Sequence, residues 1–156
     1  MPIAERLHDY LDDAHVDYLH TTHHRAYTAR SVALAEHLPA RELAKTVIFE
    51  GDGVYGAAVL AADCLVDLKR LQAELGLSSI RLASEDEIER LFPDSEAGAM
   101  APFGNLYGLP VIVDTSLARH EIITFNAGTH KDAIHMRFAE FDRLASPKIV
   151  SFARPV

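Results

Sequence analysis

Lys45 is the cation whose place in the sequence most favours chemistry. It follows Ala44 and precedes the apolar run 46–50, so its side chain leaves the end of a predicted buried strand. A lysine ammonium is a compact point charge that suits a phosphate group, or an oxygen that becomes negative during a reaction. The position also fits a structural lysine whose stem lies on apolar surface while the ammonium reaches water. On this residue alone both interpretations stay open.

The segment Gly98-Ala-Met-Ala-Pro102-Phe-Gly104 is a second candidate. Its small residues let a ligand approach the backbone closely. Pro102 fixes its own φ and restricts the residue before it, so the loop is expected to be stiff. Exposed backbone N–H groups in such a loop can bind a carbonyl oxygen or an anion. An ordinary connection between two elements is the alternative interpretation.

The turn Asn126-Ala-Gly128-Thr-His130 is a third candidate. Histidine is the side chain that most easily exchanges a proton near neutral pH, and this turn would hold His130 at the mouth of a pocket. A histidine on an ordinary surface turn is the alternative. His135 lies five positions later, which on a strand puts it on the opposite face. The two histidines are therefore not expected to form one ligand pair.

Other reactive side chains favour structural interpretations. Cys64 has no base partner beside it in the sequence, and buried cysteines are commonly inert. His20, His23 and His24 could bind a metal together, but no HExxH helix or carboxylate-rich motif accompanies them. A solvated, polar strand end is the better interpretation of that cluster. We expect neither a metal nor a cofactor.

Composition limits the class of protein. The 156 residues suit a single domain spanning 1–156, and 49% of them are hydrophobic and 24% charged. One cysteine excludes an intramolecular disulfide, and the charged, periodic N-terminus does not resemble a signal peptide. No apolar run approaches the roughly 20 residues that span a bilayer, so a soluble cytoplasmic protein with no membrane partner is expected. The net charge of −8 argues against a broad nucleic-acid surface.

Hydrophobic periodicity and turn residues predict the elements that position the candidates. Helices are expected at 3–14, 28–38, 67–75, 84–92 and 138–144. Strands are expected at 16–21, 46–50, 54–61, 80–83, 111–114, 121–125, 133–137 and 148–152. The stretch 95–109 has no sustained period, and long irregular stretches are often functional. Because strands outnumber helices and hairpins mix with crossovers, we predict an α+β domain with helices around one mixed, strongly curved sheet.

Taken together, the candidate segments resemble the YbaK-type, prolyl-tRNA-synthetase-associated editing domain, over about residues 18–152. Five features occur in the family's order: Lys45-Thr-Val-Ile-Phe49, the segment 62–71 before a helix, the GxxxP loop at 98–102, the strand segment 108–114, and the Gly-x-His turn at 128–130. A lone GxxxP or GxH is weak evidence. Five features in order at compatible spacing are much stronger.

The resemblance implies trans-editing, which is hydrolysis of the ester between a wrong amino acid and the 3′ end of tRNA. It implies that Lys45 holds the terminal nucleotide's phosphate or polarises the reacting region. The backbone from Gly98 to Pro102 would orient the ester carbonyl, and His130 would order water or the ribose hydroxyls. A vicinal ribose hydroxyl of the substrate would assist, so no side-chain base is required. What remains is to position water and stabilise the oxyanion.

The resemblance also implies a small misacylated residue such as alanine or cysteine, on tRNA-Pro or a related tRNA. Pocket volume would exclude the larger, correct amino acid. Arg25 and Arg30 would give local cations to the single-stranded end, which partly answers the objection from net charge. A partner synthetase is a further expectation. The predicted substrate-binding residues in the two turns are Ala99, Met100, Ala101, Phe103, Gly128 and Thr129.

Three other functions stay open. The chain could be a catalytically inactive aminoacyl- or nucleotide-binding module of the same fold. It could be a metal-dependent hydrolase that uses His20, His23, His24 or His130. A nucleotide-binding protein ranks last, because neither a P-loop nor a GxGxxG motif follows a strand.

Overall fold

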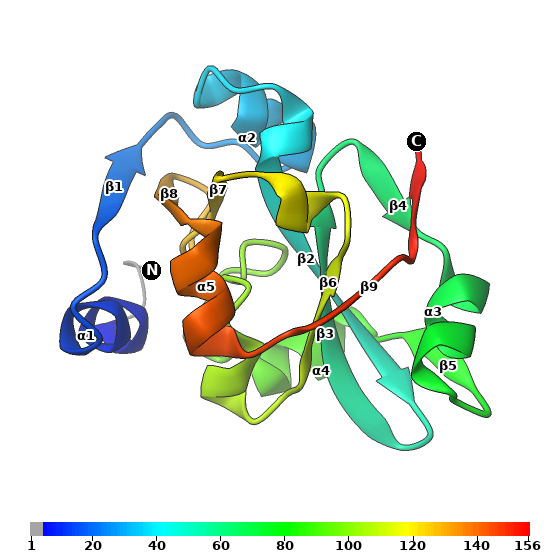
Figure 1. The fold of residues 1–156 in the computed structure, drawn as a ribbon. Helices are drawn as coiled ribbons and strands as arrows, with labels where there is room; N and C mark the ends of the chain where they lie inside the picture. The colour runs from blue at the N-terminus through cyan, green and yellow to red at the C-terminus, as the bar shows by residue number, and fades with distance from the viewer. Residues whose placement is uncertain (1–4) are drawn as a thin grey trace.

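A mixed sheet forms the centre of the structure, a computed structural model that describes residues 5–156 (Figure 1). Within those residues the sheet has eight strands, seven of them in the order β1-β8-β7-β2-β3-β6-β9, with β5 paired to β2. Their bounds are β1 (Tyr18–Thr22), β2 (Leu43–Gly51), β3 (Val54–Ala61), β5 (Ile80–Leu82), β6 (Val111–Asp114), β7 (Ile122–Asn126), β8 (Asp132–Arg137) and β9 (Lys148–Val150). β4 (Cys64–Val66) and β10 (Ala153–Pro155) form a separate antiparallel pair.

Helices surround the sheet, as the sequence predicted. They are α1 (Glu5–Asp13), α2 (Ala29–Ala35), α3 (Leu68–Leu75), α4 (Glu85–Leu91) and α5 (Phe138–Ala145), with short 3₁₀ turns at Ala40–Glu42, Gly104–Tyr107 and Leu117–Arg119. Across residues 5–156, the helices are all too short or too polar to cross a membrane.

β2 is the strand on which the sheet branches. It forms an antiparallel hairpin with β3, runs parallel to β7 at its first residues, and pairs with β5 at its last ones. β3 occupies one edge of β2, and β7 and β5 share the other edge at opposite ends of the strand. The predicted hairpin and the mixed, bent sheet are both confirmed.

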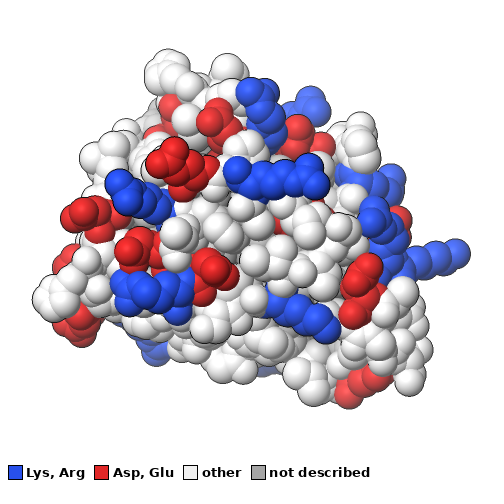
Figure 2. Space-filling view, viewed as in Figure 1, with Lys and Arg blue, Asp and Glu red and all other residues white. Residues whose placement is uncertain are grey.

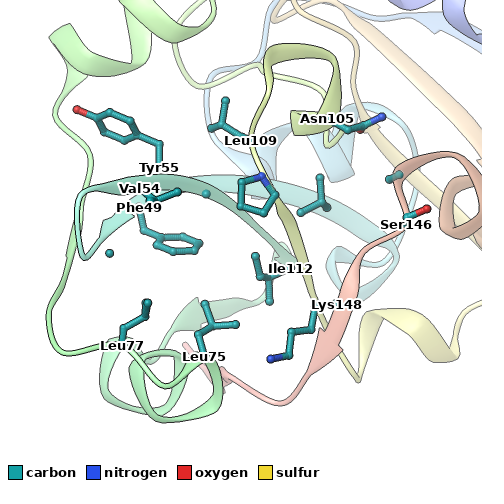
Figure 3. Close-up of a pocket in the computed structure, with 15 residues that line it drawn as sticks. Phe49, Val54, Tyr55, Leu75, Leu77, Asn105, Leu109, Ile112, Ser146 and Lys148 are labelled. Atoms are coloured by element: carbon teal, nitrogen blue, oxygen red, sulfur yellow. The ribbon is translucent and has the colours of Figure 1, made fainter.

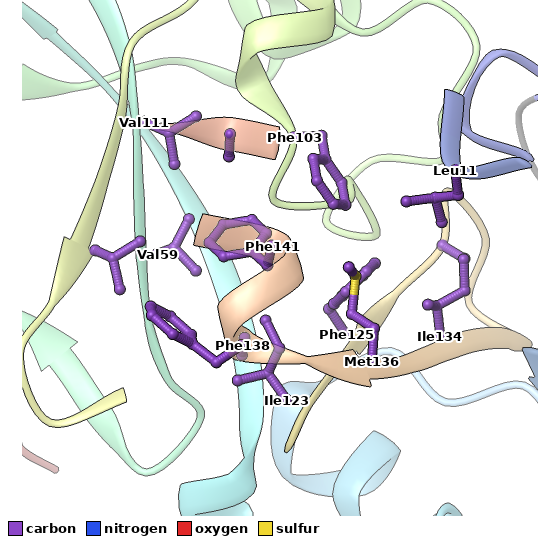
Figure 4. Close-up of a cluster of buried hydrophobic side chains, with 14 of the residues drawn as sticks. Leu11, Val59, Phe103, Val111, Ile123, Phe125, Ile134, Met136, Phe138 and Phe141 are labelled. Atoms are coloured by element: carbon purple, nitrogen blue, oxygen red, sulfur yellow. The ribbon is translucent and has the colours of Figure 1, made fainter. Parts of the chain in front are cut away.

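The two faces of the sheet carry separate cores because side chains alternate along each strand. Ala44 of β2 and Val59 of β3 face a cluster with α1, α5 and Phe103 (Figure 4). Leu43, which precedes Ala44 and points to the other face of the sheet, packs against α2. Phe49, on that same face, packs with α3. The candidate loop 98–104 therefore supports one face of the sheet, whereas α2 and α3 cover the other.

Side-chain caps and a glycine define the ends of three helices. Thr28 and Ser84 each cap a helix with a reciprocal capping box, and Asp67 caps α3. Gly76 ends α3 at φ 65°, a left-handed conformation that costs glycine little. The predicted helix at 3–14 is observed from residue 5, and its first two positions lie outside the described residues.

Several elements differ from the sequence prediction, and two boundaries and one pair of strands are instructive. β2 begins at Leu43 rather than residue 46, because Leu43 and Ala44 pair with β7, far away in sequence. α2 ends at Ala35 rather than residue 38, where His37 takes a positive φ of 59°. β4 and β10 were not predicted as strands. Each is three residues long and is defined by the other.

We expect Asp114 to be a strong stabiliser of this fold. Its carboxylate accepts the N–H groups of Phe152 and Ala153, each at 2.9 Å, and that of Ser116 at 3.0 Å. Burial raises the pKa of this carboxyl, but the hydrogen bonds outweigh burial and hold the pKa below its ordinary value. Asp114→Ala should lower the free energy of unfolding at pH 7 by about 3 kcal/mol, measured by urea denaturation.

The pH dependence follows from the lowered pKa. The stabilisation is present above the unfolded-state pKa of roughly 3.9 and is lost as the pH falls through the lower folded-state value. The difference between wild type and Asp114→Ala should therefore shrink at pH 3. Asp9→Ala, at an exposed position of α1, is the control. An equal loss of stability at pH 7 and pH 3 would count against the role of the ionised carboxylate.

Candidate active site

Gly128 joins the two glycine-bearing segments that the sequence singled out. Its N–H donates to the carbonyl of Ala99 at 2.9 Å, and its carbonyl accepts the N–H of Glu96 at 2.8 Å. Gly128 and Gly98 have φ values of 95° and 82°, which only glycine adopts without strain. The loop after α4 and the turn between β7 and β8 are thus paired, although they are far apart in sequence.

Glu96 fixes the histidine of that turn. Its carboxylate accepts the backbone N–H of His130 at 2.7 Å and pairs with the Arg25 guanidinium at 3.1 Å. Burial raises the pKa of Glu96, but the bonds from His130 and Arg25 outweigh burial and leave the pKa below its ordinary value. The carboxylate is therefore ionised at neutral pH. The sequence did not predict Glu96, which no motif marks.

The ring of His130 is oriented with one nitrogen unused. Its Nε2 lies 2.9 Å from the carbonyl of Ala97. A carbonyl only accepts, so Nε2 carries the proton and, in the neutral ring, Nδ1 carries a lone pair. Nδ1 is buried and has no partner within residues 5–156. The ring of Tyr27, a 67% exposed residue, lies 4.8 Å from the His130 ring between centroids. His130 thus offers a positioned acceptor beside an exposed aromatic ring.

Lys45 lies on the face of β2 that α2 and α3 cover, as the pairing of its neighbours requires. It lines a cavity of about 220 Å³ whose lining includes neither Gly98 nor His130. Burial lowers the pKa of Lys45, and the charge of Arg30 lowers it further, while Cys64 and Asp63 act in the opposite direction. Among residues 5–156 it forms no salt bridge. Its ammonium is therefore free to meet an anion.

Asn126 is a polar residue at the end of β7 that the sequence did not assign to the site. Leu43 and Ala44 of β2 pair with Thr124 and Phe125 of β7 in parallel register. The next residues of the two strands are Lys45 and Asn126, whose side chains leave the same face of the sheet. Asn126 Oδ1 is buried and unpartnered in the described chain. Only this register, which the sequence does not reveal, identifies the residue.

Comparison with known proteins gives this arrangement its context. Residues 23–144 match the aminoacyl-tRNA editing domain family. The chain is 30% identical over 155 residues to the multifunctional Ser/Thr-tRNA deacylase ProXp-y of Escherichia coli (strain K12), covering 96% of this chain and 92% of the relative. The chain belongs to the aminoacyl-tRNA editing domain family. It is therefore a hydrolase of the aminoacyl-tRNA deacylase class, and the predicted resemblance is confirmed.

Another relative and two solved structures of the same fold also resemble the chain. The chain is 31% identical over 98 residues to the proline–tRNA ligase of Leuconostoc citreum (strain KM20), which covers 63% of this chain and 17% of the ligase. Its fold matches the crystal structure of hypothetical protein APE2540 with a TM-score of 0.88 at 16% identity, covering 96% of this chain and 100% of the other. A protein assigned provisionally to trans-editing for prolyl-tRNA synthetase matches with a TM-score of 0.85 at 19% identity, covering 99% and 98%.

The remaining predicted residues of the editing domain lie inside the loop and the turn. Met100 is buried with Ile48 and Phe92, and Phe103 packs against Phe125 and Phe141. These two side chains support the loop from the core, so they are not exposed to a ligand. Ala99 and Pro102 are buried and Ala101 is half-buried. The Thr129 hydroxyl closes the turn, where it donates to Asp132 at 2.5 Å.

The segment from Arg25 to Arg30 links the two parts of the candidate site. Ala26 donates its N–H to the carbonyl of His130 at 3.0 Å, and Tyr27 covers the His130 ring. Arg30, on the first turn of α2, is exposed and near enough to Lys45 to lower its pKa. The structure thus brings together Gly98, Gly128 and His130 as one group and Lys45, Arg30 and Asn126 as another, and the cavity that Lys45 lines includes no residue of the first group.

The surroundings of the histidine cluster and of Cys64 favour structural roles for these residues. His20 lies 2.7 Å from Asp132. His23 was predicted to be solvated, but only 4% of its side chain is exposed, because it packs beside Glu36, which also binds His135. Within the chain from residue 5 onward, His, Cys, Asp and Glu form no group of three that could hold a metal. Burial raises the pKa of Cys64, the opposite of what an activated nucleophile needs.

A larger cavity, of about 340 Å³, lies elsewhere in the editing domain (Figure 3). Phe49, Leu75, Leu77 and Ile112 are among its walls, and Lys148 is the charged residue in its lining. None of the predicted site residues lines it. Volume alone therefore does not identify the active site of this domain.

We expect Glu96 to be required for deacylation. Glu96→Ala removes both the acceptor for the His130 N–H and the partner of Arg25, so the turn should lose its position and kcat should fall roughly 100-fold. Glu96→Gln keeps an acceptor for the His130 N–H, so its kcat should fall much less. Arg25→Ala removes only the ion pair and should resemble Glu96→Gln in a single-turnover assay of aminoacyl-tRNA. Equal activity of Glu96→Ala and wild type would show that the turn is held by other contacts.

Proposed function

We propose that this protein removes a small, wrongly attached amino acid such as alanine or cysteine from tRNA-Pro or a related tRNA. The observation that carries the proposal is the buried, unpartnered Nδ1 of His130 beside the exposed backbone of Gly98. We place the reaction in the cytoplasm, where tRNA is charged, with a synthetase as a partner that delivers or shares the tRNA.

Hydrolysis of this ester adds water to the carbonyl carbon and releases the ribose oxygen as a hydroxyl. In the proposed mechanism, His130 Nδ1 accepts a hydrogen bond from the attacking water or from a vicinal ribose hydroxyl and orients it. Within residues 5–156, the Gly98 N–H donates to no backbone carbonyl, so it is available to the ester oxygen as negative charge develops. Such an ester is already activated, and this arrangement supplies position and charge stabilisation rather than a covalent nucleophile.

Lys45 and Tyr27 would hold the terminal adenosine. The lysine ammonium, which forms no salt bridge in the described chain, suits the phosphate of that nucleotide. The outer face of the Tyr27 ring is free for a base to stack on. Arg30 adds a second positive charge near the phosphate.

Apolar buried residues near the site are consistent with selection of a small amino acid. Ala26, in the segment that links the two groups of site residues, is buried in one cluster with Leu43 and Ala33. An apolar pocket distinguishes one methylene by only about 1–3 kcal/mol, so exclusion by volume is the effective way to spare the larger correct amino acid. The relative ProXp-y is named for serine and threonine, which extends the set of small residues that a test must include.

The deciding experiment is a deacylation panel with alanyl-, cysteinyl-, seryl-, threonyl- and prolyl-tRNA. We expect turnover of one or more of the small residues and none of prolyl-tRNA. Lys45→Met should reduce kcat/KM roughly 100-fold. It should not reduce the melting temperature, because burial disfavours the charged form of Lys45 and methionine removes that charge.

Lys148→Met, at an exposed position on the edge strand β9, is the matched control and should keep full activity. Absence of turnover of all small aminoacyl-tRNAs at high protein concentration would contradict the proposal. An inactive binding module of the same fold would then be the better description. Activity abolished by a chelator and restored by zinc would favour a metal-dependent hydrolase.

A second prediction concerns Asn126. Every aminoacyl ester carries an α-ammonium, and the buried Oδ1 of Asn126 is an acceptor without a donor. We expect wild type to hydrolyse the best substrate at least 10-fold faster than its N-acetyl form, since hydrogen bonds to charged groups contribute about 1.5–3 kcal/mol. Asn126→Asp should keep this preference and Asn126→Ala should lose it. If Asn126→Ala slows both substrates equally, the amide acts only on the structure.

A further inference from the structure

The cavity beside Lys45 is lined by residues that have no role in the proposed ester hydrolysis. Its lining consists of apolar side chains and two cations, contributed by five elements: Lys45, Val47, Leu65, Val66, Leu68, Leu82 and Arg154. Leu65 and Leu82 are 39% and 51% exposed, which is high for leucines that face a concave surface. Hydrolysis of an ester at His130 requires none of these leucines.

The charges of this cavity are of one sign. Lys45 and Arg154 are its only ionisable lining residues, and neither forms a salt bridge within residues 5–156. The chain as a whole carries a net charge of −8, so two neighbouring cations without salt bridges are unusual for its surface. On the face in Figure 2, basic side chains gather on the side where β4, β10 and α3 lie. A ligand here would be anionic and would present an apolar face.

The position of the cavity relative to Lys45 limits the kind of ligand that it can bind. β7 pairs with Leu43 and Ala44 at the start of β2, whereas the cavity includes Val47 further along β2 and Leu82 of β5, which pairs with Phe49. Along β2, Lys45 therefore lies between the end that pairs with β7, where Asn126 lies, and the cavity. A chain of nucleotides whose terminal phosphate meets Lys45 would continue into the cavity.

We propose that this cavity binds the nucleotide that precedes the terminal adenosine of the acceptor end. Its base lies against Leu65 and Leu82, Lys45 contacts the phosphate that joins the two nucleotides, and Arg154 contacts the next phosphate. The proposal rests on the proposed function. A volume of about 220 Å³ is below the roughly 300–1,000 Å³ typical of pockets for drug-sized ligands, and a single base suits it better. Stacking of this kind tolerates any base, which suits an end that all tRNAs share.

The experiment compares substrates of increasing length. The amino acid that wild type removes best is attached to adenosine 5′-monophosphate, to the dinucleotide pCpA and to tRNA. In wild type, kcat/KM should rise from the mononucleotide to the dinucleotide ester. Arg154→Gln should lose that gain, roughly three- to fivefold, and leave the mononucleotide ester unchanged. With tRNA, the slope of log kcat/KM against log salt should become shallower by about 0.7, the value for one contact with a single-stranded phosphate.

Two further variants separate binding from structure. Arg154→Lys keeps the charge and should retain the salt slope, whereas Leu82→Ser should remove the gain from the added base without changing the slope. Arg143→Gln is the matched control, because Arg143 lies on α5, which covers the opposite face of the sheet. If Arg154→Gln leaves all three substrates unaffected, or slows the mononucleotide ester as much as tRNA, the proposal is overturned.

The proposed function and this inference can fail separately. If wild type hydrolyses none of the esters, the proposed function is wrong. An NMR titration with pCpA that carries no amino acid still tests the cavity. Shifts of the Leu65 and Leu82 methyl signals that disappear in Arg154→Gln support the cavity as a nucleotide site. Absence of such shifts in wild type at millimolar pCpA overturns it.

Discussion

The two backbone hydrogen bonds of Gly128 are the constraint on which the candidate site depends. They pair the turn between β7 and β8 with the loop after α4, at 2.9 Å to Ala99 and 2.8 Å from Glu96. Once this pairing is made, the Glu96 carboxylate meets the His130 N–H, and the His130 ring meets the Ala97 carbonyl. Backbone bonds of this kind depend on conformation more than on side chains. Glycine at 98 and 128 permits that conformation, and the chemistry follows from it.

β2 gives the site its second half because its two faces serve different purposes. Ala44 and Ile48 face the aromatic core and the candidate loop, while Leu43 and Lys45 face α2 and the cavity. A shift of one residue in the pairing of β2 with β7 would exchange these faces and move Lys45 into the core. The core therefore protects the register that puts Lys45 and Asn126 on the same face of the sheet. Stability and site geometry are linked through this strand.

Local signals predicted what local interactions determine. The hairpin of β2 and β3 and the helices that follow Thr28, Asp67 and Ser84 depend on residues a few positions apart, and the sequence predicted all of these elements. The start of β2, the pair β4–β10 and the burial of His23 depend on partners 70 or more residues away or on another element. Within the site, order and spacing identified the glycine segments. Glu96 and Asn126 required the pairing itself, which no spacing encodes.

For an acidic protein that acts on tRNA, the positions of a few cations matter more than the total number of cations. On the face shown in Figure 2, acidic and basic side chains lie interspersed around a largely uncharged middle, and a duplex gains little from such a mixture. A single-stranded end is different, because a few phosphate contacts and one or two stacking surfaces hold it. Arg25 is partly neutralised by Glu96, whereas Lys45 and Arg154 form no salt bridge in the described chain. The net negative charge then acts against nonspecific binding of nucleic acid, while in the proposed complex the acceptor end contacts both of these cations and remains favoured.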